Sequence, residues 1–143
     1  GFNAPVDEDI RTAVWSKICS NIGVNPISVI CGATMEEMCG DENVCDVMRA
    51  ILREVLAVTN KLGVKLPGDI LDNVDRGVRL GSFRTSTLQS FEQGKAIEID
   101  SIVGAVSELG QLVGVSTPQI DAVYALTRLR ANIAGCYTAP QGH

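Results

Sequence analysis

Apolar residues recur at three- and four-residue spacing along nearly the whole of this 143-residue chain. That spacing is the period of an amphipathic α-helix, whereas a half-buried strand alternates apolar and polar residues. No segment of four or more residues alternates strictly enough to indicate such a strand. The sequence therefore predicts an all-α fold, and the length suits a single compact domain.

Capping and turn residues divide this pattern into a series of helices. Thr34 and Glu37 have the spacing of a capping box, Asp41 can cap the following helix, and Gly114 is placed for a left-handed stop. Pro118 favours a helix start, because proline tolerates the first helical position. The predicted helices cover residues 7–24, 34–40, 41–62, 69–80, 86–94, 98–113 and 117–133.

The stretch "WSKICSNIGVN" places Lys17 and Asn21 inside the first predicted helix and Asn25 directly after it, at four-residue spacing, and Pro26 should then kink or interrupt the helix. On a helix that turns about 100° per residue, these polar side chains interleave with apolar ones such as Ile18. A lysine and two amides buried there would need partners, because an unsatisfied buried polar group costs on the order of a few kcal/mol.

Two interpretations of this polar row stay open. In the first, the row is a polar network inside the core, or its lysine extends to solvent from the edge of the core. In the second, the row is one wall of a cleft whose polar groups converge on a small polar ligand. The lysine would then act as a cation or as a proton donor.

A second polar stretch, "TSTLQSFEQGKAIEID", contributes Ser86, Gln89, Glu98 and Asp100. A carboxylate such as Glu98 could balance the charge of Lys17 and tune its acidity. Capping and surface exposure explain most serines and acidic residues near helix starts. The spacing alone therefore leaves these residues as weak candidates.

Charge and hydropathy exclude two classes of partner. The net charge is −5, and the lysines and arginines are scattered along the chain, so no basic stripe indicates nucleic acid or an anionic membrane surface as a partner. No apolar run approaches the roughly 20 residues that a membrane span requires.

The cysteines indicate reduced thiols in a cytoplasmic protein. There are five of them, an odd number, and none forms a C-x-x-C pair. The only histidine is His143. Because a zinc site would use histidines or closely spaced cysteines, we expect no metal site.

Three motifs, taken in order, resemble the C-terminal domain of the ketopantoate reductase (2-dehydropantoate 2-reductase) family. "WSKICSNIGVNP" matches the family's W-x-K-x-x-x-N-x-x-x-N-P, and "STLQ" followed by "EID" matches S-x-x-Q…E-[IV]-D. "GQLVGVSTP" matches G-x-x-x-G-[VI]-x-[TV]-P. The ordered set spans residues 15–118 and is more specific than any one motif.

The resemblance implies a helical fold like the C-terminal domain of 6-phosphogluconate dehydrogenase over residues 1–143. The chain would be the substrate-binding and dimerisation domain, with its N-terminal Rossmann domain outside the sequence given. That missing domain would hold most of the NADP. The start "GFNAPVDED" also has the look of the middle of a longer protein, and we expect a homo-oligomer.

The resemblance also implies roles for individual residues. Lys17 would be the general acid that protonates the developing alkoxide as hydride reduces a 2-oxo acid to a 2-hydroxy acid, 2-dehydropantoate being the family's substrate. Asn21 and Asn25 would bind polar groups of the substrate, and Ser86 would lie near its carboxylate. Glu98 would lie at the hydroxyl end of the substrate or against the lysine.

Two departures from the family pattern qualify these expectations. Ser90 stands where the family usually has aspartate, and no G-x-G-x-x-G fingerprint for a dinucleotide follows a strand anywhere in the chain. We therefore expect this chain alone to be inactive. Two alternatives stay open, a non-catalytic helical dimerisation or scaffold domain and a reductase for another 2-oxo or hydroxy acid.

Overall fold

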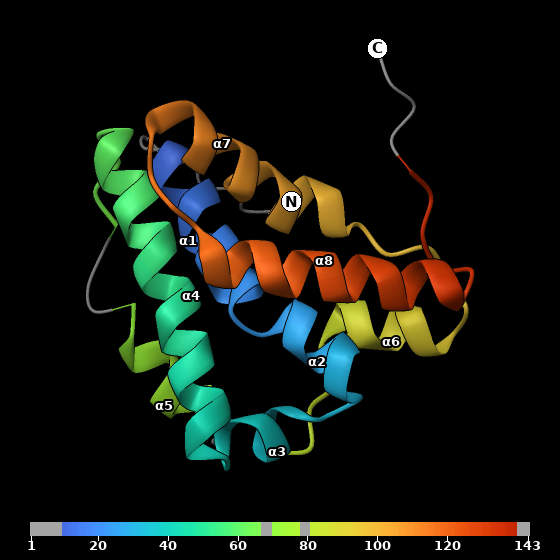
Figure 1. The fold of residues 1–143 in the computed structure, drawn as a ribbon. Coiled ribbons are helices and arrows are strands. Elements are labelled where there is room, and N and C mark those ends of the chain that lie inside the picture. The colour runs from blue at the N-terminus through green and yellow to red at the C-terminus, as the bar shows by residue number, and fades with distance from the viewer. Residues whose placement is uncertain (1–9, 67–69, 78–80, 140–143) are drawn as a thin grey trace, which may run out of the picture.

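The computed structural model describes residues 10–66, 70–77 and 81–139, and within these ranges it contains helices and no strand (Figure 1). The all-α prediction is therefore confirmed. The elements are α1 (Ile10–Ile22), α2 (Asn25–Cys31), α3 (Met35–Cys39), α4 (Glu42–Lys61), α5 (Asp72–Gly77), α6 (Ser86–Glu92), the π-helical segment η2 (Asp100–Gly104), α7 (Ala105–Val113) and α8 (Pro118–Ile133).

The predicted caps of α3 and α4 are present. The Thr34 hydroxyl accepts from the Glu37 backbone N–H at 3.3 Å, and the Glu37 carboxylate accepts from the Thr34 backbone N–H at 2.8 Å. The backbone hydrogen bond from Thr34 lowers the pKa of the Glu37 carboxyl. At the start of α4, the Asp41 carboxylate accepts from the N–H groups of Asn43 and Val44 at 2.9 and 3.1 Å.

The predicted first helix differs from the structure at its C-terminal end. Helix α1 ends at Ile22, and a separate helix α2 begins at Asn25 with Pro26 in its first turn. A proline lacks the N–H that a helix interior needs, but the first turn has no use for that N–H. The chain therefore turns just before the proline and starts a new helix. The expected start at Asp7 and both ends of the expected 69–80 helix lie outside the described residues.

The predicted helix 98–113 also differs, because it opens with the π-helical segment η2. The Asp100 carboxylate accepts hydrogen bonds from the hydroxyls of Tyr124 and Tyr137. At the other end of η2, a Cβ on Gly104 would come within 3.0 Å of the Tyr124 ring. The π-helical segment, whose backbone is wider than that of an α-helix, therefore contacts Tyr124 of α8 at both of its ends. Burial, and then the hydrogen bond to Asp100, raise the pKa of Tyr124.

The motif "GQLVGVSTP" has a structural role. Gly114 has φ 70°, as predicted for a left-handed stop, and the Val115 N–H returns to the Gly110 carbonyl at 2.8 Å. A Cβ on Gly110 would lie 2.8 Å from the Thr117 methyl carbon. Glycine at this position therefore lets the chain fold back closely between α7 and α8.

The N-terminus of α8 is capped by a residue from another helix. Pro118 starts this helix as predicted, but the Thr117 side chain caps no backbone N–H. The Glu54 carboxylate on α4 instead accepts from the N–H groups of Gln119 and Ile120, both at 2.9 Å. A negatively charged carboxylate at this end of a helix also interacts favourably with the positive end of the helix dipole.

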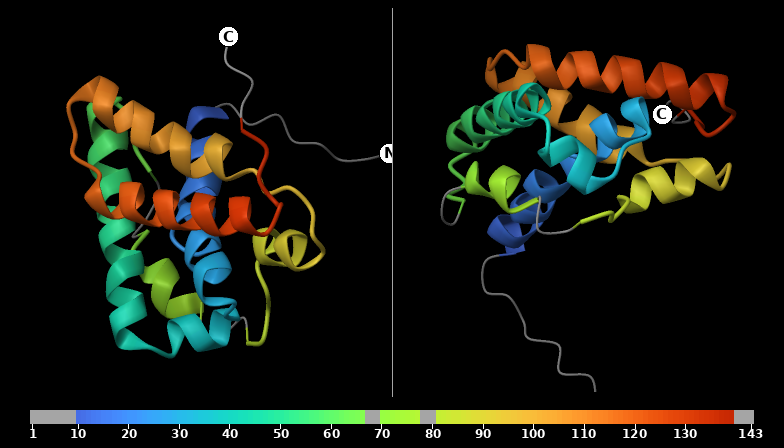
Figure 2. Two further views of the ribbon diagram at one scale, coloured as in Figure 1. Left: turned by 45° about the vertical axis from the view of Figure 1, so that its right-hand side comes forward. Right: turned by 90° about the horizontal axis from the view of Figure 1, so that it is seen from below.

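Helix α4 carries much of the core and contacts α1, α3, α5, α7 and α8. Its buried face comprises Cys45, Met48, Ile51, Leu52, Val55, Val58 and Thr59. Helix α2 lies between α8 and α6, as the view from below shows (Figure 2). The guanidinium of Arg130 on α8 donates to the Ile30 carbonyl at the end of α2 at 2.5 Å. Helix α2 is thereby fixed on one side and leaves its first turn facing α6.

None of the helices in the described ranges combines the length and the hydropathy that crossing a membrane would require.

We predict that Glu54→Ala lowers the free energy of unfolding by about 1 to 2 kcal/mol, the usual cost of losing a helix N-cap. Urea denaturation followed by circular dichroism measures this change. Glu108→Ala is the matched control, because Glu108 is exposed on α7 and its loss should change stability by less than about 0.5 kcal/mol. Equal effects of the two substitutions would contradict the assignment of Glu54 as the cap.

Candidate functional site

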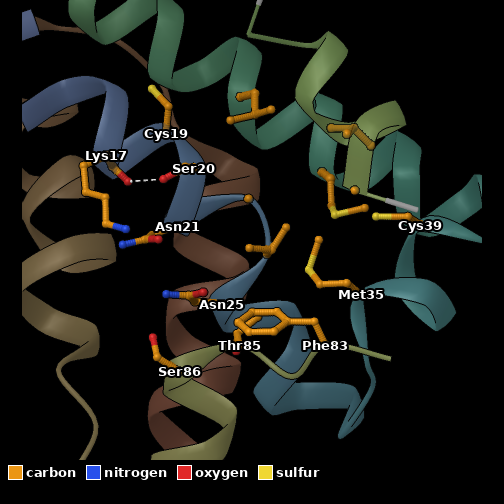
Figure 3. A pocket seen from close by; sticks show the side chains of 16 residues that line it. Lys17, Cys19, Ser20, Asn21, Asn25, Met35, Cys39, Phe83, Thr85 and Ser86 are labelled. Carbon is orange, nitrogen blue, oxygen red and sulfur yellow. Dashed lines mark hydrogen bonds between the residues drawn. The ribbon is translucent and has the colours of Figure 1, made fainter. Parts of the chain in front are cut away.

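A cleft of about 400 Å³ opens between the α1–α2 corner and the helices α3, α4 and α5. Along one wall lie Lys17 and Asn21 from α1, Asn25 from the start of α2, and Ser86 from the start of α6. Figure 3 shows these four side chains in a row, with the Lys17 amine beside the Asn21 amide. Four of the five predicted site residues therefore line one cavity. We call these four residues the polar row.

The exposure of the polar row favours the cleft interpretation over a buried network. Lys17 and Ser86 are exposed, Asn21 is partly exposed, and Asn25 is buried with 6% of its surface accessible. The interpretation in which Lys17 is buried in a core network, one of the two left open, does not describe this structure. The break after Ile22 separates Asn25 from the helix of Lys17 and Asn21, so one helical projection could not describe all three side chains.

A chain of hydroxyl groups fixes Asn25 relative to Ser86. The Ser28 hydroxyl donates to the backbone carbonyl of Asn25 at 2.7 Å and lies 2.7 Å from the Thr85 hydroxyl. Since Ser28 has one hydroxyl proton, Thr85 is the donor in the second bond. Thr85 also accepts from the Leu88 N–H at 3.1 Å as the N-cap of α6. The two helix starts that carry the asparagine and the serine are thus joined directly.

Glu98 lies in an adjoining hollow of about 270 Å³. Asn21, Asn25 and Ser86 line this hollow as well, but Lys17 does not. Within the part of the chain that the structure describes, no ion pair joins Lys17 to Glu98. The alternative in which Glu98 lies against the lysine is therefore absent from this arrangement. The three shared residues connect the lysine side of the cleft to the carboxylate side.

The segment around Glu98 is held by the end of the chain. The Ile97 N–H donates to the Cys136 carbonyl at 2.9 Å, and the Tyr137 hydroxyl donates to the Asp100 carboxylate at 3.2 Å. These contacts lie on either side of Glu98 in the sequence. They leave its exposed side chain at the edge of the hollow.

The wall opposite the polar row is apolar, and the sequence analysis missed it. It includes Met35 from α3, Met48 and Leu52 from α4, Val74 from α5, and Phe83. These residues come from separate parts of the chain, so no local spacing signals their convergence. The Met35 N–H donates to the Phe83 carbonyl at 2.9 Å and joins two of the segments.

Three further polar residues near the row were also missed. Ser28 and Thr85 position it, and Ser90 lines the hollow that contains Glu98. Thr85 could have been identified from its position directly before a short helix, which is typical of an N-cap. Nothing in the sequence around Ser28 distinguishes it from a surface serine, and Ser90 was noted only as a departure from the aspartate of the family.

Two thiols line the cleft, and that of Cys19 is no nucleophile at neutral pH. Burial raises the pKa of Cys19 to about 11, so its thiolate forms only in strongly alkaline solution. Among the described residues, no three His, Cys, Asp or Glu side chains come together as metal ligands would. The chemistry available in the cleft is therefore that of an ammonium group, two amides, a hydroxyl and a nearby carboxylate. Such groups can bind and protonate a small oxygen-rich anion.

Comparison with known proteins places this chain among enzymes of one family. A family model described as the C-terminal domain of ketopantoate reductase PanE/ApbA matches residues 9–131. A 2-dehydropantoate 2-reductase of Mesorhizobium japonicum is 41% identical over 138 residues, which are 96% of this chain and 42% of that protein. The chain spans less than half the length of the curated relatives it matches.

Solved structures share the fold. A ketopantoate reductase of the PanE/ApbA family from Ralstonia eutropha superposes with a TM-score of 0.85 at 30% identity, over 92% of this chain and 45% of that one. A dimeric ketopantoate reductase from Staphylococcus aureus superposes with a TM-score of 0.80 over 91% of this chain and 46% of that one. The second match is 20% identical and is a likeness of fold alone.

Proposed function

Because the chain belongs to the ketopantoate reductase family, as its C-terminal domain, we propose that it forms the substrate-binding part of a cytoplasmic, NADP-dependent reductase. The reaction is the reduction of a 2-oxo acid to a 2-hydroxy acid, with 2-dehydropantoate as the first candidate substrate. The observation that carries this proposal is the polar row, in which Lys17, Asn21, Asn25 and Ser86 line one cleft.

Lys17 is the proton donor in this proposal. As the carbonyl carbon of the acid gains a hydride, its oxygen gains negative charge and takes a proton from the Lys17 ammonium. The product is the 2-hydroxy acid, and the lysine is left as a neutral amine. The exposure of Lys17 supports this role, because an exposed amine can regain its proton from water.

The other members of the row hold the acid. Ser86 and the amide of Asn25 can donate hydrogen bonds to its carboxylate, and Asn21 beside the lysine can donate to the carbonyl oxygen. Glu98, across the shared residues, can accept from a hydroxyl of the substrate or product. These residues lie along one cleft and its adjoining hollow, which supports this assignment of their roles.

The residues of this chain do not fit the dinucleotide part of the cofactor. The sequence contains no G-x-G-x-x-G, and the described ranges hold no strand that could precede one. We assign that part of NADP to a Rossmann domain in the remainder of the protein. When bound, the nicotinamide supplies the hydride, and the residues of this chain orient the acid and supply the proton.

The competing proposal is a helical scaffold or dimerisation domain without catalysis. A scaffold has no requirement for an ammonium, two amides and a hydroxyl along one open cleft. The fixing of Asn25 to Ser86 through two buried hydroxyls supports the enzyme, because a binding site benefits from preorganised polar groups.

We predict that Lys17→Ala in the full-length protein lowers kcat by a factor on the order of 100 or more, the usual scale for an acid–base group. The free energy of unfolding should change by about 1 kcal/mol or less, because the side chain is exposed. Steady-state kinetics with NADPH and urea denaturation measure the two quantities on one variant.

Two further variants isolate the proton transfer from the charge. Lys17→Arg keeps the positive charge but holds its proton too tightly to donate it. The kcat of this variant should therefore be as low as that of Lys17→Ala. Lys61→Ala, at the exposed end of α4, should behave as the unmodified protein. Near-normal turnover of Lys17→Ala, with or without loss of stability, would contradict the catalytic role.

A further prediction concerns the cofactor. The 143-residue chain alone should bind NADPH poorly and catalyse no reduction, because the pyrophosphate would have no helix N-terminus in a Rossmann domain to bind. Isothermal titration calorimetry compares this chain with the full-length protein, and circular dichroism verifies that both are helical. Saturable one-to-one binding of NADPH by the isolated chain would show that the cofactor site is assigned to the wrong part of the protein.

We also propose that the protein is a homo-oligomer that associates through α8. Leu126, Leu129 and Ile133 are 55%, 57% and 78% exposed, and their helical spacing puts them on one stripe. Such a stripe is costly to leave in water and suits a second copy of the same helix. In the full-length protein, Leu129→Asp should lower the molar mass measured by light scattering to that of the monomer.

Leu112→Asp is the control for this experiment, because Leu112 is 81% exposed on α7 and lies off the stripe. That variant should keep the mass of the unmodified protein. If the molar mass of Leu129→Asp is unchanged, the association does not occur through α8.

A further inference from the structure

Asp100 is a polar residue of the motif "EID" that the proposed function leaves without a role. One oxygen of its carboxylate, Oδ1, accepts hydrogen bonds from the Tyr124 hydroxyl of α8 and, at 3.2 Å, from the Tyr137 hydroxyl beyond α8. The guanidinium of Arg128 lies over both tyrosine rings, 5.5 and 6.0 Å from their centroids. Helix α8 and the segment that follows it are thereby joined to the start of η2 through one carboxylate.

Both tyrosines keep the protons that they donate. Burial, and then the hydrogen bond to Asp100, raise the pKa of Tyr137, in the same direction as for Tyr124. At neutral pH the two hydroxyls are therefore donors, and the carboxylate is the acceptor. Hydrogen bonds to a carboxylate are about twice as strong as those between neutral groups. Asp100 is therefore held firmly from two directions.

The π-helical segment sets the direction in which Asp100 points. In η2 the Ala105 N–H bonds to the Asp100 carbonyl, five residues back, whereas an α-helix uses the residue four back. The additional residue turns the preceding chain by about 100° relative to an unbroken α-helix. Asp100 thereby faces Tyr124. Such π-helical turns are frequent at functional sites, and this one begins two residues after Glu98.

The backbone of Glu98 is restrained, whereas its carboxylate is available to a ligand. The Ile97 N–H bonds to the Cys136 carbonyl, where the segment after α8 passes the segment that leads into η2 (Figure 1). The Ser101 hydroxyl donates to the Glu98 carbonyl at 3.1 Å. Ile97 and Ile99 are 6% and 2% exposed, so both neighbours of Glu98 are anchored in the core.

Among the described residues, none hydrogen-bonds to the Glu98 carboxylate or pairs with it, and the side chain lies exposed at the edge of the hollow. The position of this carboxylate in the hollow therefore depends on its backbone. That backbone is fixed on one side by Ile97 and on the other side by Asp100.

We propose that Asp100 is a positioning residue for Glu98. Tyr124 and Tyr137 hold Asp100, and Asp100 holds the backbone turn from which Glu98 reaches the hollow. This inference rests on the proposed function, in which Glu98 accepts a hydrogen bond from a hydroxyl of the substrate. Asp100 itself lines neither the cleft nor the hollow, so it acts on the substrate only through Glu98.

An effect confined to the substrate hydroxyl distinguishes positioning from loss of folding. The test compares 2-dehydropantoate with 3,3-dimethyl-2-oxobutanoate, which has the same carbon skeleton and a hydrogen in place of the hydroxyl. Both acids are reduced by the full-length protein with NADPH, and the hydroxyl ratio is kcat/KM for the first acid divided by kcat/KM for the second.

Asp100→Ala removes the acceptor of both tyrosines. We expect the hydroxyl ratio to fall about tenfold, the scale of one hydrogen bond to a charged group. A loss of folded protein lowers both values of kcat/KM equally and leaves the ratio unchanged. Asp100→Asn keeps an oxygen that can accept from both tyrosines, so its ratio should stay near that of the unmodified protein.

Asp121→Ala is the matched control. The Asp121 Oδ1 also accepts from two hydroxyls, those of Ser107 at 2.6 Å and Thr117 at 3.2 Å. Asp121 lies in the first turn of α8 and lines neither the cleft nor the hollow. This variant should lose stability as Asp100→Ala does, as measured by urea denaturation, and keep the hydroxyl ratio.

Tyr137→Phe decides the question if Asp100→Ala does not fold. It removes one of the two donors to Asp100 and keeps the half-buried ring, so the hydroxyl ratio should fall about threefold. An unchanged ratio in folded Asp100→Ala, or in Tyr137→Phe where the alanine variant does not fold, would overturn the positioning role.

Glu98→Ala separates this inference from the proposed function. Alone it should lower the hydroxyl ratio about tenfold, and adding Asp100→Ala should lower it no further, because both changes remove the same contact. A further fall in the double variant would overturn the route through Glu98. If Glu98→Ala lowers the ratio and Asp100→Ala does not, only the positioning role of Asp100 fails.

Failure of the proposed function has its own signatures. If Glu98→Ala leaves the hydroxyl ratio unchanged, the role of Glu98 in binding the hydroxyl fails, and the positioning role fails with it. If the full-length protein oxidises NADPH with neither acid, the reductase assignment fails, and both roles fail with it.

Discussion

The hydroxyl contact between Ser28 and Thr85 holds the candidate site together. It joins two segments that are 57 residues apart in the chain, at the first turn of α2 and the N-cap of α6. Both side chains are buried, and both hydroxyls have a second backbone partner, so the contact leaves no polar atom without a hydrogen bond. Loss of either hydroxyl would leave the other, away from water, with its backbone partner alone. The separation of Asn25 from Ser86 is therefore set by a buried interaction that solvent does not weaken.

Local rules predicted most of the helices, because the signals that begin and end a helix lie within a few residues. The capping box at Thr34, the Asp41 cap and the left-handed Gly114 all came from such short-range chemistry. The same rules gave the existence of the first helix but misplaced its end. A proline in a first turn and a proline that interrupts a helix look alike in sequence until the preceding turn is known.

The rest of the site depends on contacts between distant segments. The carboxylate that caps α8 comes from Glu54, more than sixty residues earlier. The apolar wall likewise combines Met35, Leu52 and Phe83, which have no common sequence pattern. The residues of the polar row were identified because Lys17, Asn21 and Asn25 are close in sequence and resemble a family motif. The apolar wall opposite them had no such signal.

The contacts of the C-terminal segment have a practical consequence for choosing domain boundaries. The family match ends at residue 131, whereas Cys136 bonds to the backbone of Ile97 and Tyr137 to the side chain of Asp100, on either side of Glu98. A chain shortened to end at residue 131 would keep every residue of the cleft. It would lose the two hydrogen bonds that hold the segment of Glu98 in place. Expression of this domain should therefore extend through Ala139, with any affinity tag attached by a spacer beyond it.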